Sequence, residues 1–272
     1  MVPKPHGIQE LCVDYRKVNA ITKSDSYPVP RLEGYFEKVF EPNREELVYV
    51  LLFNVLVFCQ VKKEVGDVSI LINNAGIVTG KKFMESPDAL LEKTMEVNSL
   101  AHFWTYKAFL PAMIASNHGH LVSIASTAGL FPVNGLADYC ASKFAAVGFA
   151  ESVALELLVS GKNGVRTTIV CPYFINTGMF DGCKTKWPHL LPILDVNYAA
   201  KKITDAILRD QVLLVMPRSL YFMFAIKNLL PVKLGILLGH YFGVFNVMDH
   251  FKVSHSYLLF IHLDAFIHEG SV

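Results

Sequence analysis

Three side chains in the middle of the sequence, those of Ser126, Tyr139 and Lys143, have types and a spacing that suit chemistry on an alcohol. Tyr139 and Lys143 are four residues apart in a stretch that the pattern predicts as a helix over 138–160, so they share one helix face. Ser126 ends a predicted strand, and the carboxyl ends of parallel strands face the ligand crevice of an open sheet. We therefore expect the three side chains to converge.

A phenol with its ordinary pKa of about 10 is a poor base at neutral pH. A neighbouring ammonium favours the phenolate, so we expect Lys143 to lower the pKa of Tyr139. The tyrosine can then accept an alcohol proton while a cofactor accepts the hydride, and the Ser126 hydroxyl can hold the substrate oxygen. A lone Tyr-x-x-x-Lys pair more often serves packing or solvation than catalysis, so the surrounding sequence decides between the two interpretations.

Alternating strand and helix patterns surround these residues and must position them. Short β-rich runs occupy 68–74, 120–126, 165–171 and 211–217. Longer helical patterns occupy about 86–116, with a break, and then 138–160 and 197–209. Strands separated by helices in this rhythm indicate βαβ units and a parallel sheet, which places the chain in the α/β class.

The composition excludes several classes of protein. Hydrophobic residues make up 52% of the 272 residues, charged residues make up 18%, and the mean hydropathy is +0.35, which excludes a disordered chain. Lys and Arg number 25 against 24 Asp and Glu, so the net charge of +1 gives no general case for nucleic-acid binding. Five cysteines without a Cys-x-x-Cys pair argue against a disulfide scaffold and against a zinc module, and we expect no metal site.

The composition also divides the chain into parts. These are a polar segment over 1–46, an apolar run over 47–61, the alternating strands and helices over 62–217, an apolar tail over 218–250 and an unassigned tail over 251–272.

Two of these segments are strongly apolar. Residues 47–61 form a charge-free run, shorter than the roughly 20 residues that a spanning helix needs, so they are either a core segment or a shallow membrane anchor. Residues 218–250 combine large apolar side chains with Arg218, Lys227 and Lys233, which favours lying on a membrane over crossing it. A substrate-pocket lid or a dimer interface is the alternative for this second segment.

Further motifs follow the strands in a recognisable order. They are Asn73-Asn74-Ala75-Gly76 after the first strand, Asn98 on the next helix, and Pro172 through Thr177 after the third strand. Together with Ser126 and the Tyr139–Lys143 pair, this set resembles the short-chain dehydrogenase/reductase family over about residues 61–250. Residues 119–126 and 138–153 are similar to the membrane-associated retinol and hydroxysteroid dehydrogenase branch of that family.

The resemblance implies a reaction and a site. The reaction is reversible hydride transfer between a lipid-like alcohol, of the retinol or steroid class, and NAD, with NADP not excluded. Tyr139 would be the acid/base, Lys143 would also hold the nicotinamide ribose, Ser126 would position the substrate oxygen and Asn98 would hold a water that relays protons to Lys143. The implied cofactor-binding residues are Asn73, Ala75, Gly76, Tyr139, Lys143, Pro172, Ile175 and Thr177.

The same resemblance implies surroundings for the protein. The loop over 173–194 and the tail would shape an apolar pocket for the substrate. The branch implies a place on the endoplasmic reticulum membrane or a lipid droplet, on the cytosolic face, and a possible homodimer through the helices that carry Asn98 and Tyr139.

One departure from the family affects all of these expectations. The family fold begins with a strand and a glycine-rich turn that lets the backbone approach the cofactor pyrophosphate. Before Gly76 the sequence has only Gly7, Gly34 and Gly66, which are too widely spaced for that turn. We expect a partial Rossmann-like, doubly wound parallel sheet that lacks the first strands of the family fold, with the strand over 68–74 as an edge unless 47–61 pairs with it. The alternative function is a catalytically inactive remnant on a membrane or lipid droplet, without cofactor binding.

The start of the chain resembles something else. Residues 4–34, through the stretches CVDYRKVN at 12–19 and YPVPRL at 27–32, resemble part of a retrotransposon reverse transcriptase. The metal-binding aspartates of the polymerase are absent from this stretch, so the resemblance implies no polymerase function and no nucleic-acid partner. We interpret 1–46 as an unrelated segment joined to a truncated dehydrogenase.

Overall fold

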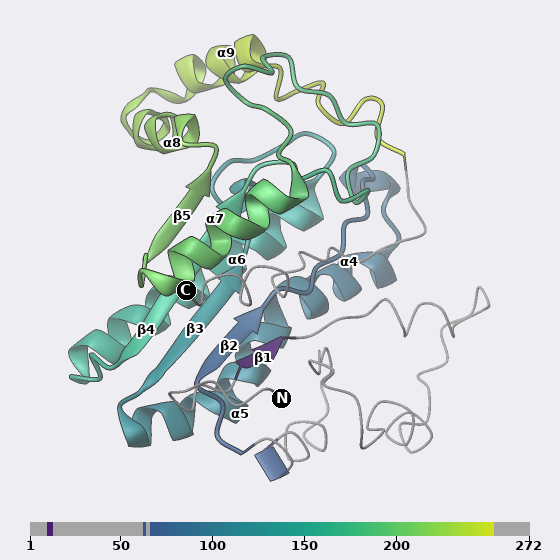
Figure 1. Ribbon diagram of the computed structural model, residues 1–272. Coiled ribbons are helices and arrows are strands. Elements are labelled where there is room, and N and C mark those ends of the chain that lie inside the picture. The colour runs from purple at the N-terminus through teal and green to yellow at the C-terminus, as the bar shows by residue number, and fades with distance from the viewer. Residues whose placement is uncertain (1–9, 13–61, 64–65, 253–272) are drawn as a thin grey trace.

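The computed structural model describes residues 10–12, 62–63 and 66–252 (Figure 1). The apolar run at 47–61, most of the segment that resembles a reverse transcriptase, and the tail from residue 253 onward lie outside the described residues. The predictions made for those segments therefore remain predictions.

The described strands form one parallel sheet whose spatial order follows the sequence. The strands are β1 (Glu10–Cys12), β2 (Ile70–Asn73), β3 (Gly119–Ile124), β4 (Val165–Pro172) and β5 (Leu213–Met216). Strands β2 to β5 are the predicted strands, so the α/β class with a parallel sheet is confirmed.

The neighbour of β2 differs from the expectation. Glu10, Leu11 and Cys12 pair in parallel with Ile70, Leu71 and Ile72, so β2 is not an open edge along these residues. The pairing strand comes from the segment interpreted as unrelated to the domain. Any extended chain can form hydrogen bonds with the unpaired N–H and C=O groups of an edge strand, whatever its side chains. An unrelated segment can therefore pair with β2.

The helices lie between the strands as predicted. They are η1 (Phe83–Glu85), α4 (Asp88–Met95), η2 (Glu96–Leu100), α5 (Ala101–Ser116), η3 (Thr127–Gly129), α6 (Ala137–Val159), α7 (Val196–Leu208), α8 (Ser219–Leu229) and α9 (Val232–Phe242). Helix α4 begins after Pro87 with Asp88 in its first turn, a favourable charge at a helix N-terminus. The predicted break in the helical stretch at 86–116 is η2, a π-helical turn that joins α4 to α5.

Helices cover both faces of the sheet, as a doubly wound fold requires. Figure 1 shows α7 in front of the sheet and α5 and α6 behind it. Successive strand residues point to opposite faces. Leu121 accordingly packs with Phe109 of α5, while its neighbour Val122 packs with Ile203 of α7.

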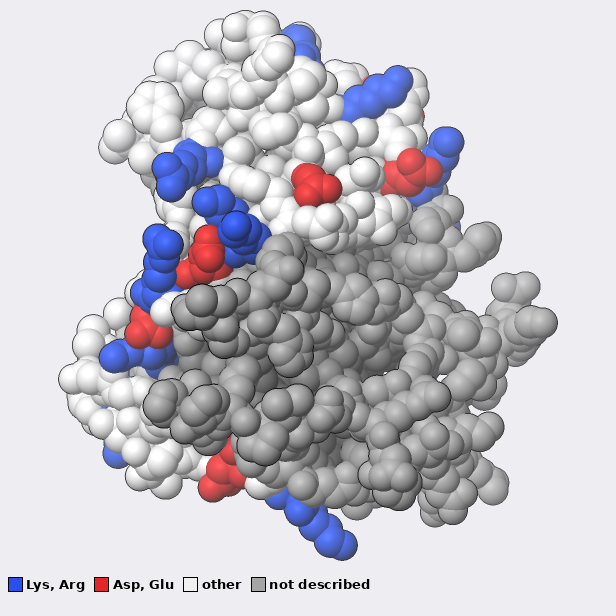
Figure 2. Space-filling model, in the orientation of Figure 1, with Lys and Arg blue, Asp and Glu red and all other residues white. Residues whose placement is uncertain are grey.

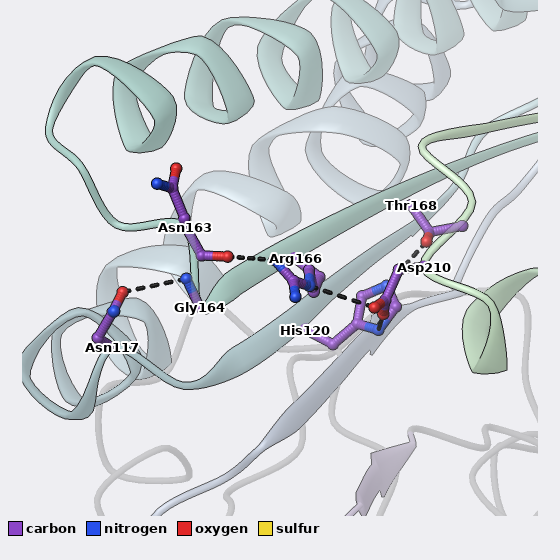
Figure 3. A network of polar contacts seen from close by, with 7 residues as sticks. All are labelled: Asn117, His120, Asn163, Gly164, Arg166, Thr168 and Asp210. Carbon is purple, nitrogen blue, oxygen red and sulfur yellow. Dashed lines mark hydrogen bonds and ion pairs between the residues drawn. The ribbon is translucent and has the colours of Figure 1, made fainter.

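A polar network closes the amino-terminal ends of β3 and β4 (Figure 3). The His120 Nε2 atom lies 2.8 Å from the Thr168 hydroxyl, and Arg166 Nε donates to Asp210 at 3.2 Å. Residues at the carboxyl ends of the same strands carry the predicted site, so this network belongs to the far end of the sheet and fastens β3, β4 and the loop before β5 together.

Helix α5 carries a buried histidine close to the sheet. His102 is 2% exposed, and neither of its ring nitrogens has a hydrogen-bond partner among the described residues. Burial, with a smaller contribution from the charge of Lys143, lowers the pKa of His102 from 6.5 to about 3. The imidazole is therefore neutral in the folded protein at neutral pH.

This histidine should make stability fall with falling pH. Below pH 6.5 the unfolded chain protonates His102 while the folded protein does not, so the unfolded state binds more protons. Between pH 7.5 and pH 5.5 we expect His102 to remove about 1.4 kcal/mol of unfolding free energy. Urea unfolding of the wild type and of His102→Gln at both pH values measures this, since the variant should lose that part of the pH dependence. An equal pH dependence in the two proteins would contradict the assignment.

Candidate active site

The structure brings Ser126, Tyr139 and Lys143 together. Ser126 follows the end of β3, and its hydroxyl accepts a hydrogen bond of 3.1 Å from the Ala128 amide, which fixes the start of η3. The same hydroxyl lies beside the Tyr139 phenol, whose pKa it lowers. Tyr139 lies in the first turn of α6, where its side chain is 2% exposed. The convergence that the spacing predicts is therefore present.

Lys143 is buried one turn further along α6. Its ammonium donates to the Ile124 carbonyl at 3.1 Å and lies 5.7 Å from the centroid of the Tyr139 ring. Burial lowers the pKa of Lys143 to about 8, because the charged form loses its hydration. A charge in this position ties the carboxyl end of β3 to α6.

The predicted lowering of the Tyr139 pKa is wrong for this structure. Burial raises the pKa of the phenol above its usual value, and the neighbouring Ser126 hydroxyl offsets only part of that rise. The physical reason is that removing water from the phenolate outweighs the nearby favourable contacts. The phenol is thus protonated at neutral pH and able to donate a hydrogen bond.

Asn98 sits in the π-helical turn, where a helix presents side chains in directions that a regular α-helix does not. Its amide oxygen accepts from the Ile77 amide at 2.8 Å, and its amide nitrogen donates to the Ile77 carbonyl at 2.9 Å and to the Ser142 hydroxyl at 2.9 Å. Asn98 therefore clamps the loop after β2 onto α6.

The motif after β2 supplies polar atoms and space. The Asn73 side-chain oxygen accepts from the Thr105 hydroxyl at 3.0 Å. The Asn73 side-chain nitrogen and the Asn74 side-chain oxygen are buried without a partner among the described residues. At Gly76 an added Cβ would lie 3.4 Å from the Lys143 ammonium nitrogen, so this glycine keeps the approach to the ammonium open.

The residues after β4 form a loop beside Tyr139. Pro172 is the last residue of β4, Ile175 pairs with Leu194 in an isolated bridge, and the Thr177 amide donates to the Ile175 carbonyl at 2.8 Å. The ring of Phe180 stands edge-on to the Tyr139 ring, with 5.8 Å between centroids. A cavity of about 150 Å³ lies within this loop, lined by Phe174, Ile175, Asn176, Gly178, Phe180, Asp181, Gly182, Cys183 and Ile193.

Sequence reasoning missed several residues that support the site. The Ser142 hydroxyl accepts a hydrogen bond from the Asn98 side-chain nitrogen, and the Ser142 main-chain carbonyl accepts one from the Ser99 hydroxyl at 2.7 Å. Thr79 donates to the buried Asp138 carboxylate at 2.6 Å. Each pair is separated by more than 40 residues along the chain, so the sequence pattern alone carries no signal for it. The described residues include no cluster of His, Cys, Asp or Glu able to hold a metal ion.

Comparison with known proteins finds similar sequences over most of the described residues. Residues 55–186 match the short chain dehydrogenase family. The chain is 65% identical over 192 residues to epidermal retinol dehydrogenase 2 of Mus musculus, covering 71% of this chain and 62% of that protein. It is 47% identical over 194 residues to retinol dehydrogenase 10 of Homo sapiens, covering 71% of this chain and 57% of that protein. The chain thus spans about three fifths of the length of these relatives.

A solved structure shares the fold. The crystal structure of a short chain dehydrogenase/reductase from Burkholderia phymatum in complex with NAD superposes with a TM-score of 0.54 at 21% identity, covering 64% of this chain and 69% of that one. The parallel sheet, the site built on its carboxyl edge and these matches lead to one conclusion: the chain belongs to the short-chain dehydrogenase/reductase family.

Proposed function

We propose that this protein transfers a hydride between a lipid-like alcohol, of the retinol or steroid class, and a nicotinamide cofactor. The observation that carries the proposal is the buried Tyr139 phenol, which has the Ser126 hydroxyl beside it and the Lys143 ammonium 5.7 Å from its ring centroid. Relatives named as retinol dehydrogenases support an alcohol substrate. A family structure in complex with NAD supports NAD as the cofactor, and NADP is the alternative.

The residues around Lys143 fit the nicotinamide half of such a cofactor. Gly76 leaves room beside the ammonium, and the unpartnered side-chain atoms of Asn73 and Asn74 can bond a ligand rich in hydroxyl and amide groups. When bound, the nicotinamide would supply the hydride acceptor or donor. We assign its binding to Asn73, Ala75, Gly76, Tyr139, Lys143, Pro172, Ile175 and Thr177.

The side chains of this protein would handle the proton. In carbonyl reduction Tyr139 donates its phenol proton to the substrate oxygen, and in alcohol oxidation it takes that proton back. Ser126 holds the same oxygen by its hydroxyl. Burial favours the protonated phenol, which is the form that donates a proton in carbonyl reduction. Alcohol oxidation needs the phenolate instead, and a positive charge close to the phenol would favour that form by lowering the pKa of Tyr139. Asn98 holds the loop that contains Gly76 in place through its two hydrogen bonds to the Ile77 backbone. We propose that Asn98 also orders a water that relays protons to Lys143.

Replacement of Tyr139 by Phe tests the assigned acid/base. Turnover of retinol or retinal should fall by about 10²–10⁴-fold, because the phenol proton is lost while the ring remains. Tyr106→Phe is a matched control, since Tyr106 is also buried and its hydroxyl lies 3.0 Å from the Ser123 hydroxyl. Steady-state rates of both variants, with unfolding curves to confirm folding, make the comparison. Equal rates in the two variants would remove Tyr139 from the mechanism.

A second candidate function is the catalytically inactive remnant. It is favoured by the lack of a glycine-rich turn before Gly76, because such turns bind the cofactor pyrophosphate. Each charge-assisted hydrogen bond lost there would weaken cofactor binding by roughly 1.5–3 kcal/mol. The two candidates differ in whether the purified chain binds a nicotinamide cofactor.

Titration with NADH separates these candidates. For the enzyme we expect a saturable change in NADH fluorescence that Gly76→Val abolishes, because its side chain would occupy the space beside the Lys143 ammonium. Circular dichroism of both proteins checks that they are folded. A folded wild type that gives no saturable change at any accessible NADH concentration is the remnant.

We also propose that helices α8 and α9 rest on a lipid surface, that of the endoplasmic reticulum or of a lipid droplet, from the cytosolic side. No helix in the described part of the chain is long and apolar enough to span a bilayer. The surface over α8 and α9, at the top of Figure 2, is mostly white with isolated basic side chains. The large apolar side chains exposed there include Phe222, Leu229, Val232, Ile236 and Leu237.

Flotation with phospholipid vesicles tests this surface. The wild type should float with vesicles that contain anionic lipid, and less so at high salt, because basic residues flank the apolar side chains. Ile236→Glu with Leu237→Glu should reduce the floated fraction severalfold. Val159→Glu is the control, since Val159 is an exposed apolar residue on α6, away from this surface. Unchanged flotation of the double variant would rule out the proposed contact.

Helices α5 and α6 carry exposed apolar side chains that a second copy of the chain could cover. Trp104, Phe144 and Leu155 are 39%, 41% and 62% exposed on these helices. We propose a homodimer through this face, which sedimentation of the purified protein would detect as twice the chain mass.

A further inference from the structure

The chain after α9 returns to the candidate site. Residues 245–252, here named the C-terminal strap, cross the loops that surround Tyr139. The Asn134 side-chain amide donates to the Phe245 carbonyl at 2.8 Å, and the Lys252 amide donates to the Asp181 carbonyl at 2.9 Å. The strap is therefore fastened at one end to the loop before α6 and at the other to the loop after β4.

Apolar contacts hold the middle of the strap. Val247 is 7% exposed and packs in one cluster with Phe174 and Cys183. The thiol of Cys183 lies 3.4 Å from the Met248 sulfur. These contacts place the strap against the loop after β4, which also holds the cavity described above.

Phe251 makes the most specific contact of the strap. An added Cβ at Gly80 would lie 1.9 Å from the Phe251 ring, so the ring sits directly on the glycine backbone. On the other side, the Phe251 ring lies 6.4 Å from the Phe180 ring, which stands edge-on to Tyr139. Phe251 thus joins the loop after β2 to the loop after β4, next to the phenol.

The side chains packed around Tyr139 on this side are apolar. They are Val78, Ala128, Leu136, Cys140 and Met179, with Val133, Phe180, Met248 and Phe251 packed against them. The buried polar pair Thr79 and Asp138 is joined by a hydrogen bond to one carboxylate oxygen, while the other, Oδ1, has no partner among the described residues. An alcohol whose oxygen reaches Tyr139 must therefore place its carbon skeleton among apolar side chains that include the strap.

We propose that Phe251 is a specificity-determining residue for the alcohol substrate. Its ring, seated on Gly80 and 6.4 Å from the Phe180 ring, packs against the apolar cluster that contains Tyr139, so it would set how much space a carbon skeleton finds beside the phenol. This inference rests on the proposed function. Removal of the ring enlarges that space, which weakens the fit of short skeletons and admits bulkier ones, while the Ser126–Tyr139 pair stays in place.

A series of allylic alcohols of growing length tests the inference: prenol, geraniol, farnesol and retinol. In Phe251→Ala the ratio of kcat/KM for retinol to kcat/KM for prenol should rise by at least about tenfold relative to the wild type, mainly through changes in KM. Tyr198→Ala is the control, because Tyr198 is a half-exposed aromatic residue in the first turn of α7 and does not belong to the apolar cluster around Tyr139. A ratio that stays within about twofold in a folded Phe251→Ala variant overturns the proposal.

A second variant reaches the same contact from the other side. Gly80→Ala leaves the Phe251 ring intact but displaces it, so it should shift the ratio in the same direction. The double variant should behave like Phe251→Ala alone, because both changes act on one contact. Additive effects of the two changes on the retinol-to-prenol ratio would contradict the proposed contact between the Phe251 ring and Gly80.

Direct binding separates this inference from the proposed function. Retinol fluorescence measures binding to each variant without turnover. A wild type that binds retinol but does not oxidise it, with binding altered severalfold by Phe251→Ala, would leave the inference standing while the proposed reaction fails. Equal retinol binding by wild type and variant, or none by either, would overturn the inference.

Discussion

The burial of one ammonium group constrains the whole site. Lys143 is 2% exposed, and a charge taken out of water is costly unless polar groups surround it. The Ile124 carbonyl and the Tyr139 ring supply that environment, which they can do only if α6 docks against the carboxyl end of β3. The docking is close, because an added Cβ at Gly129 of η3 would lie 2.6 Å from the Lys143 carbonyl oxygen. The position of Tyr139 beside Ser126 follows from this docking.

The loop after β2 is held by a different device. A π-helical turn between α4 and α5 lets Asn98 reach the Ile77 backbone with both ends of its amide. Its third bond, to Ser142, connects that loop to the helix that carries Tyr139 and Lys143. The irregular turn therefore joins three segments, and a regular helix would have directed the Asn98 side chain elsewhere.

Some apolar side chains of the tail after β5 pack against the rest of the fold, and others are exposed. In α8, Leu220 is buried against the sheet, while Phe222 on the same helix is 70% exposed. The exposed side chains of α8 and α9 give the fold its apolar surface, and the strap that follows brings Val247, Met248 and Phe251 back to the loops around Tyr139. The exposed apolar side chains and the strap therefore belong to successive parts of one segment, and the proposed lipid contact and the proposed role of Phe251 would use different residues of it.

The sequence by itself determined where strands β2 to β5 lie along the chain, the helices between them and the spacing that brings Ser126, Tyr139 and Lys143 together, because hydrophobic periodicity and motif spacing are local properties. Tertiary structure alone decided the neighbour of β2, the raised pKa of Tyr139 and the seat of Phe251 on Gly80. Pairing with an edge strand, desolvation and packing depend on groups far apart in the chain, and no local pattern encodes how much water they exclude from one another.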